Sequence, residues 1–221
     1  MKKLKIILLG TKTLIAETIL GQLEAHHYPF EQIVLMDQQE PAQKSLFYMG
    51  EEKPILPIDL FSEKSPFIAL VCDKKIPLIY PKKKIPKHSK VIDCTGLISK
   101  APCFIPSINH LNPRTRLICA PTSLSVILAS ALTPLKTKAH HFQVIALIGT
   151  SFFGKESGQK LRAQNLNLFA KENLDLTFSS PTFAFNLIPE IVPEEKLITP
   201  QQLKCLTNIS IDFCYIFRVS N

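Results

Sequence analysis

The first 37 residues hold the pattern that most restricts the fold of this chain: two apolar runs separated by a helical pattern. The first run, Lys3–Gly10, predicts a buried strand that ends in glycine. Thr13 can cap a helix, and the second run, Gln32–Asp37, predicts another strand. The helix carries its apolar residues at helical spacing, at Leu14, Ile15, Ile19, Leu20 and Leu23. This order of elements predicts an α/β sheet with parallel strands.

Three more apolar segments continue the alternation in the first half of the chain: Pro66–Cys72, Lys90–Cys94 and Arg116–Ala120. Residues 45–60 are cut by prolines and predict a pair of minor strands. We therefore expect residues 1–122 to form one domain, with a doubly wound and mostly parallel sheet.

The second half has a different pattern. After a helical segment at Ser123–Ala131, the long apolar stretch His141–Thr150 predicts a strand, and the polar segment 154–173 predicts an amphipathic helix. Strands are expected again within Thr182–Ile191 and over Ile209–Val219. A long strand, a helix and further strands predict a smaller α+β domain over residues 123–221.

The composition excludes two classes of protein. With 46% hydrophobic and 20% charged residues, the chain resembles an ordinary globular protein rather than a disordered one. No uninterrupted apolar run approaches the roughly 18 residues of a membrane span. The apolar start is followed by Lys12, without a small-residue cleavage pattern, so it is read as a strand and not as a signal peptide. We expect a cytoplasmic protein with no membrane partner.

The chain has six cysteines, and none forms a C-x-x-C pair, which argues against a metal site. Four of them stand in or beside apolar runs: Cys72, Cys94, Cys119 and Cys214. We interpret them as reduced, buried thiols that act as small hydrophobic side chains.

The net charge of +8 raises the question of an anionic partner. The excess is concentrated in a lysine loop at residues 74–90, which contains Lys74, Lys75, Lys82, Lys83, Lys84, Lys87 and Lys90. Prolines break this segment, so it cannot be one basic helix. It also has a single aromatic residue, Tyr80, where a nucleic-acid platform would interleave several. A solvated loop is therefore favoured over an anion or nucleic-acid site.

The turn after the first strand is where a dinucleotide would bind. A pyrophosphate approaches the backbone at a helix N-terminus, and this needs glycines. Here the turn keeps only Gly10, followed by Thr11, while Thr13 stands at the second glycine position. Asp37, at the end of the second strand, could accept a ribose hydroxyl, and its charge would repel a 2′-phosphate. We expect no cofactor or weak NAD binding, with Gly10, Thr11, Thr13 and Asp37 as the candidate cofactor-binding residues.

Several segments in this order resemble aspartate-semialdehyde dehydrogenase. Val91-Ile92-Asp93 resembles the family's VIDNSS strand end, and Pro121–Ser125 stands where the family has its NPNCST turn. Phe185–Ile191 is close to FNVIPQI, and Gly154-Lys155 fits SGAGKAG. The resemblance spans most of the chain. It implies an N-terminal Rossmann-like domain that binds NAD(P), followed by a smaller α+β dimerisation domain.

The departures from the family fall on its chemistry. By the resemblance, Ser123 stands at the position of the nucleophilic cysteine, Ile148 at that of a glutamine and Ile216 at that of an arginine. The family's late histidine would fall beyond Asn221, and its phosphate-binding arginine aligns near Ser99. A serine hydroxyl needs an adjacent base to act as a nucleophile, and Ser123 beside Thr122 can instead cap a helix.

Three hypotheses about function remain open. The first is a protein of this fold, similar to the divergent Usg-type branch, that has lost catalysis and acts by binding. The second is an active NAD(P)-dependent semialdehyde dehydrogenase of amino-acid biosynthesis, with Cys119 or Cys94 as a shifted nucleophile. The third is an anion or nucleic-acid binder that uses the lysine loop. We also expect a homodimer through residues 123–221, because one helix cannot cover the apolar surface of that domain's strands.

Overall fold

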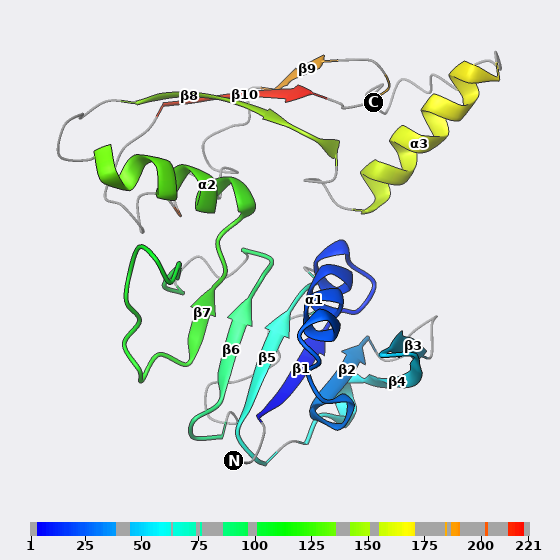
Figure 1. Cartoon of the computed structure of the whole chain (residues 1–221), viewed down its shortest axis with the longest axis vertical. Helices are drawn as coiled ribbons and strands as arrows, with labels where there is room; N and C mark the ends of the chain where they lie inside the picture. The colour runs from blue at the N-terminus through cyan, green and yellow to red at the C-terminus, as the bar shows by residue number, and fades with distance from the viewer. Residues whose placement is uncertain are drawn as a thin grey trace. The chain divides into compact units, whose positions relative to one another are not determined.

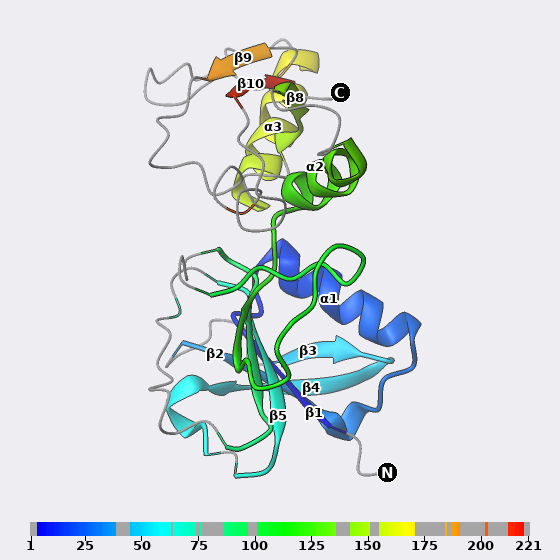
Figure 2. The same ribbon diagram turned by 90° about the vertical axis from the view of Figure 1, so that its left-hand side faces the viewer.

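The computed structural model describes residues 4–38, 45–62, 64–73, 76, 86–96, 101–135, 142–150, 155–170, 184, 187–190, 202 and 212–218. The chain divides into two compact units (Figure 1, Figure 2). Unit 1 holds the described residues up to Pro134, and unit 2 holds those from Leu135 onward. None of the described helices is long and apolar enough to cross a membrane.

Unit 1 is built around a seven-stranded sheet with the spatial order β3-β4-β2-β1-β5-β6-β7. Strand β1 lies at its centre and pairs in parallel with β2 on one side and β5 on the other. Only β3 runs antiparallel to its neighbour, β4. The bounds are β1 Lys5–Leu9, β2 Ile33–Asp37, β3 Ser45–Tyr48, β4 Glu51–Pro57, β5 Phe67–Val71, β6 Lys90–Asp93 and β7 Leu117–Cys119.

Both faces of the central strands are buried. Helix α1 (Leu14–Ala25) packs on one face, with Ala16 and Leu20 against Leu8 and Leu35. The other face carries a second apolar cluster, which includes Ile7, Leu9, Met36, Phe67, Ala69, Val71 and Val91. This is why β1, β2 and β5 read as continuous apolar runs in the sequence instead of alternating with polar residues.

A tight hairpin closes one edge of the sheet. Its two turn residues, Met49 and Gly50, have positive φ angles of 53° and 79°. Turns of this kind match the twist of the strands they join. Tyr48, just before the turn, is buried, and its hydroxyl donates to the carbonyl of Tyr28 at 2.6 Å. This bond ties the hairpin to the segment that follows α1.

The connection from β6 to β7 contains no helix in its described part, residues 94–96 and 101–116. Cys103 instead forms an isolated parallel bridge with Cys119 of β7. After β7, Thr122 caps helix α2 (Ser123–Leu132): its hydroxyl accepts the amide N–H of Ser125 at 3.2 Å.

Unit 2 has a three-stranded sheet in the order β8-β10-β9, with β8 Gln143–Ile148, β9 Leu187–Glu190 and β10 Asp212–Arg218. The central strand β10 is parallel to β8 and antiparallel to β9. Helix α3 (Lys155–Phe169) lies between β8 and β9 in the sequence and carries three exposed apolar side chains: Leu166, Leu168 and Phe169.

The structure confirms the predicted fold class, an α/β fold with a mostly parallel, Rossmann-like sheet. Most observed strands are a residue or two shorter at their ends than the apolar runs that predicted them. Helix α2 belongs to unit 1, whereas the predicted second domain begins at Ser123, the first residue of that helix.

Candidate functional site

The candidate site is the edge of the unit 1 sheet where the parallel strands end. The chain adds β2 on one side of β1 and later adds β5 on the other, so the strand order reverses at β1. In open α/β sheets, ligands bind at the carboxyl ends of the strands at such a reversal. The candidate residues Gly10, Thr11, Thr13 and Asp37 all lie at this edge, after β1 or at the end of β2.

Gly10 packs directly against the loop that follows β5. Its φ is +89°, and its N–H donates to the carbonyl of Met36 at 2.9 Å. A Cβ added at Gly10 would lie 2.4 Å from Cβ of Asp73 and 2.9 Å from its backbone nitrogen. The glycine is therefore required by contact within the chain, whatever ligand this edge binds.

Asp37 and Thr11 form a buried polar pair. One carboxylate oxygen of Asp37 accepts both the Thr11 N–H, at 3.1 Å, and the Thr11 hydroxyl, at 2.9 Å. Its other oxygen accepts the N–H of Gln38 at 2.8 Å. Asp37 is 5% exposed and Thr11 is 2% exposed. Asp37, the carboxylate predicted to accept a hydrogen bond from a ribose hydroxyl, thus already accepts three hydrogen bonds from the chain.

Thr13 begins helix α1. Its hydroxyl accepts the amide N–H of Ala16 at 3.2 Å, as the sequence predicted for a capping residue. The same hydroxyl donates to the carbonyl of Gly10 at 3.5 Å. Thr13 therefore joins the glycine turn to the helix N-terminus, where the sequence placed a pyrophosphate.

The next strand along this edge ends in a second buried acid. Asp93, fully buried at the end of β6, accepts the N–H of Thr95 at 2.8 Å and its hydroxyl at 2.6 Å. The carbonyl of Asp93 accepts the N–H of Ala120, which follows β7. Sequence reasoning assigned no role to Asp93 or to Asp73. Their position, directly after apolar strands, is the signal that could have found them.

Ser123 lies at the first position of α2 and is exposed. Within the described part of the chain, its hydroxyl has no hydrogen-bond partner, and the neighbouring Thr122 supplies the cap. The Thr122 hydroxyl is also 2.8 Å from that of Ser125, which is fully buried. The hydroxyls of Thr122 and Ser125 thus take part in hydrogen bonds that hold the turn and the helix.

The two cysteines considered as shifted nucleophiles have different surroundings. Cys119 is 3% exposed, packs with Ala101 and Cys103, and lies 3.6 Å from the carbonyl of Ala120. Cys94 is half-buried and follows β6. It is adjacent to Cys72, at the end of β5, and hydrogen bonding to Cys94 and burial raise the pKa of the Cys72 thiol.

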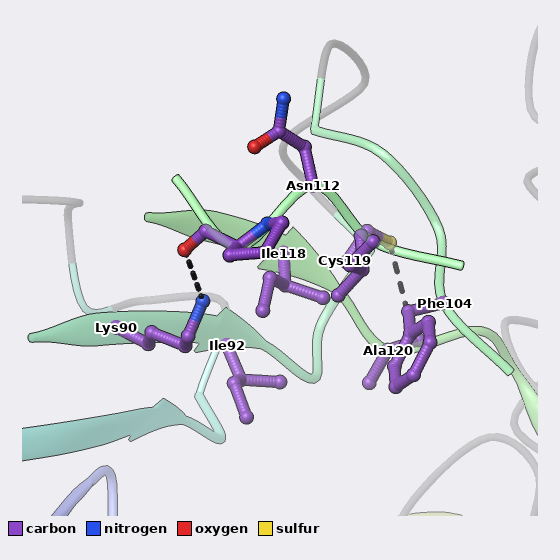
Figure 3. A pocket seen from close by; sticks show the side chains of 9 residues that line it. Lys90, Ile92, Phe104, Asn112, Ile118, Cys119 and Ala120 are labelled. Atoms are coloured by element: carbon purple, nitrogen blue, oxygen red, sulfur yellow. Dashed lines mark hydrogen bonds between the residues drawn. The ribbon is translucent and has the colours of Figure 1, made fainter. Parts of the chain in front are cut away.

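A mostly apolar cavity of about 360 Å³ lies beside β6 and β7 (Figure 3). Its walls include Ile92, Phe104 and Ile118. At its margin, the Lys90 ammonium donates to the carbonyls of Thr115, at 2.9 Å, and Pro113, at 3.3 Å. Of the seven lysines in the lysine loop, only Lys87 and Lys90 are among the described residues. The hydrogen bonds of Lys90 hold the segment that leads into β7.

Two residues expected at catalytic positions lie in unit 2. Ile148 is the last residue of β8, and Ile216 belongs to the neighbouring strand β10, where it pairs with Leu147. The positions near Ser99 lie outside the described residues. No group of three or more metal-ligating side chains occurs in the described part of the chain.

No protein-family model and no curated protein matches the chain. Solved structures do match it. A probable aspartate-semialdehyde dehydrogenase from Pseudomonas aeruginosa has a TM-score of 0.82 at 20% identity, over 98% of this chain and 71% of its own. Aspartate semialdehyde dehydrogenase II from Vibrio cholerae, complexed with ASA, gives 0.80 at 18% identity, over 99% and 71%. The Francisella tularensis enzyme gives 0.71 at 16% identity, over 99% and 73%.

These similarities show that the chain has the fold of aspartate-semialdehyde dehydrogenases. They agree with the resemblance drawn from the sequence motifs. At identities of 16–20% they do not extend to the chemistry of the site.

Proposed function

We propose that this chain is an aspartate-semialdehyde-dehydrogenase-like protein that has lost catalysis and acts by binding, as a homodimer or with a partner protein. The proposal places it in the divergent Usg-type branch that its motifs resemble. The observation that carries it is Ser123: the residue at the nucleophile position is an exposed serine with no basic partner among the described residues.

The hydrogen bonds of Asp37, at the edge of the sheet where a dinucleotide was expected to bind, support the same proposal. A carboxylate offers about four acceptor sites, and Asp37 uses three of them within the chain. A ribose hydroxyl would compete with Thr11 for a side chain that is 5% exposed. NAD binding would therefore be weak or absent, and NADP would bind more weakly still because Asp37 repels a 2′-phosphate.

The alternative is an active NAD(P)-dependent semialdehyde dehydrogenase with a shifted cysteine. Cys119 lines the cavity beside β6 and β7 (Figure 3), but it is only 3% exposed, which argues against its attack on a substrate, since a nucleophilic cysteine needs access and a thiolate. Cys94 has more exposure, and its immediate neighbour is the Cys72 thiol. The anion-binding alternative rests on seven lysines, of which Lys87 and Lys90 are among the described residues.

One experiment separates the first two functions. The purified chain is mixed with aspartate semialdehyde and phosphate or arsenate, and reduction of NAD or NADP is followed by absorbance. We expect no turnover in the wild type or in Cys119→Ser. Turnover in the wild type that Cys119→Ser abolishes would establish the shifted nucleophile and overturn the proposal. In parallel, melting curves with NAD and NADP measure binding, because a ligand of the native state raises the melting temperature.

The homodimer is supported by the apolar surface of unit 2. Phe169 of α3 is 76% exposed and Leu166 is 63% exposed. The two side chains stand three residues apart on one helix, so they share a face, and a closed two-fold pair is the commonest way to bury such a face.

Light scattering at micromolar concentration should give twice the chain mass. Phe169→Glu should weaken the dimer about ten-fold or more, while Phe47→Glu, at an equal 76% exposure in unit 1, should leave it intact. A wild-type monomer, or equal effects of the two changes, would contradict the dimer.

A further inference from the structure

Two cysteines meet at the carboxyl edge of the unit 1 sheet. Strands β5 and β6 are parallel, and Leu70 pairs with Ile92 in their register. Cys72 and Cys94 lie two residues further along the two strands, so they fall on the same face and opposite each other. The N–H of Cys94 donates to the carbonyl of Val71 at 2.9 Å, which holds the two chain segments together at this point.

The spacing at this point suits a covalent bond between the two sulfurs. Neighbouring strands lie about 4.8 Å apart, and disulfides join Cα atoms that are about 4.4–6.8 Å apart. Cys72 and Cys94 each lie just beyond the last residue of their strand, Val71 and Asp93. The raised pKa of the Cys72 thiol, of which hydrogen bonding to Cys94 is the largest cause, agrees with this proximity.

The two thiols also differ in exposure, and this difference sets the order in which an oxidant reaches them. Cys94 is half-buried, whereas Cys72 is 3% exposed. A small oxidant can therefore reach Cys94 first, and Cys72 is placed to complete the exchange.

We propose that Cys72 and Cys94 are a reversible oxidation site, at which a small-molecule disulfide such as oxidised glutathione is reduced to two thiols as a Cys72–Cys94 disulfide forms. The Cys94 thiolate attacks one sulfur of the small disulfide, forms a mixed disulfide and releases the first thiol. As the Cys72 sulfur then attacks the Cys94 sulfur, its proton passes to the departing sulfur, which leaves as the second thiol. Two protein thiols are oxidised, and the one small disulfide is reduced.

The site has a consequence for the edge of the sheet. Cys72 is followed by Asp73, whose backbone and Cβ pack against Gly10. A covalent link between β5 and β6 would fix the start of this loop. Oxidation would thus stiffen the candidate binding edge.

A second cysteine pair provides the control. Cys103 and Cys119 are also paired across parallel segments, but both are buried, at 6% and 3% exposed. An oxidant therefore reaches either residue of this pair less readily than it reaches the half-buried Cys94.

The test treats the full chain with oxidised glutathione, alkylates the remaining thiols, and maps the products by mass spectrometry. We expect the mass to fall by two hydrogens, two fewer of the six cysteines to be alkylated, a cross-linked peptide containing Cys72 and Cys94, and reversal by dithiothreitol. Cys94→Ser should lose the product, and Cys103→Ser should keep it. A lasting glutathione adduct, a cross-link involving any other cysteine, or no reaction would each overturn the proposal.

Discussion

The contact between Gly10 and Asp73 predicts a large loss of stability for Gly10→Ala. Two costs act together. A φ of +89° lies in the left-handed region, which costs an L-residue about 1–2 kcal/mol. The new Cβ would also lie 2.4 Å from Cβ of Asp73 and 2.9 Å from its backbone nitrogen, so the backbone must move, at about 1–3 kcal/mol. We expect the free energy of unfolding of unit 1 to fall by about 3 kcal/mol.

Alanine variants of two other glycines distinguish the conformational cost from the steric cost. Gly50 has a φ of +79° but open space where a Cβ would stand, so Gly50→Ala should cost only the conformational part, about 1 kcal/mol. Gly21 lies inside α1 with nothing within 4 Å, so Gly21→Ala should stabilise by about 0.5–1 kcal/mol.

Urea unfolding followed by tyrosine fluorescence measures the three variants, because three of the four tyrosines lie in the first 134 residues. In thermal melts, Gly10→Ala should lower the melting temperature by roughly 6–12 °C. If Gly10→Ala and Gly50→Ala cost the same within about 0.5 kcal/mol, the close approach of the loops after β1 and β5 does not exist and the reasoning fails.

Three further changes in unit 1, the first with a matched control, test two hydrogen bonds and the strain of one turn. Thr11→Val removes one hydrogen bond to the buried carboxylate of Asp37 and should cost about 1–2 kcal/mol, whereas Thr18→Val, on the exposed face of α1, should cost less than about 0.5 kcal/mol. Met49→Asn should stabilise by about 0.5 kcal/mol, because asparagine tolerates the φ of +53° at this turn. Tyr48→Phe should cost about 1 kcal/mol at pH 8 by losing a partly buried hydrogen bond. Burial raises the pKa of Tyr48 above 10.0, so this contribution is complete below pH 10 and is lost as the pH rises through the folded-state pKa.

Each of these is measured by urea unfolding of the variant beside the wild type. Equal costs for the two threonine changes would show that the Asp37 pair adds nothing to stability. A loss of stability in Met49→Asn would mean that the Met49 side chain, 43% exposed, packs in a way that outweighs the strain of its turn. A Tyr48→Phe difference that stays constant from pH 8 to pH 11 would contradict the raised pKa.

Much of the fold was predictable because burial leaves a periodic signal. Strands β1 and β5 are buried on both faces and read as continuous apolar runs, and α1 shows helical spacing after a capping threonine. The predicted ends of the strands were less exact because the apolar runs continue beyond the last paired residue of each strand. The place of α2 in unit 1 was not predictable, since it depends on contacts between distant segments and not on the residues of the helix itself.

The geometry of the candidate site followed less well from the sequence. The motif located Gly10, Thr11 and Asp37, but not the bonds between them, because a short-range pattern cannot show which partner an acid meets 26 residues away. The contact of Gly10 with Asp73 and the pairing of Cys72 with Cys94 arise from strand order and register. The two contacts can be predicted only when β5 is known to lie between β1 and β6.

The hydrogen bonds between Thr11 and Asp37 also affect how a nucleotide could bind at the carboxyl edge of the unit 1 sheet. A hydrogen bond from a ribose hydroxyl to Asp37 would replace the bond from Thr11 with one of the same kind, so the exchange yields little net free energy. The ligand would also lose translational freedom, which the Thr11 side chain does not. Affinity at this edge must then come from other contacts, at a turn where Asp73 packs against Gly10 and Thr13 caps the helix. Thr11→Val therefore separates two cases: if its melting temperature rises with NAD while that of the wild type does not, the internal hydrogen bond is what limits NAD binding, and if neither rises, that bond is not the limiting feature.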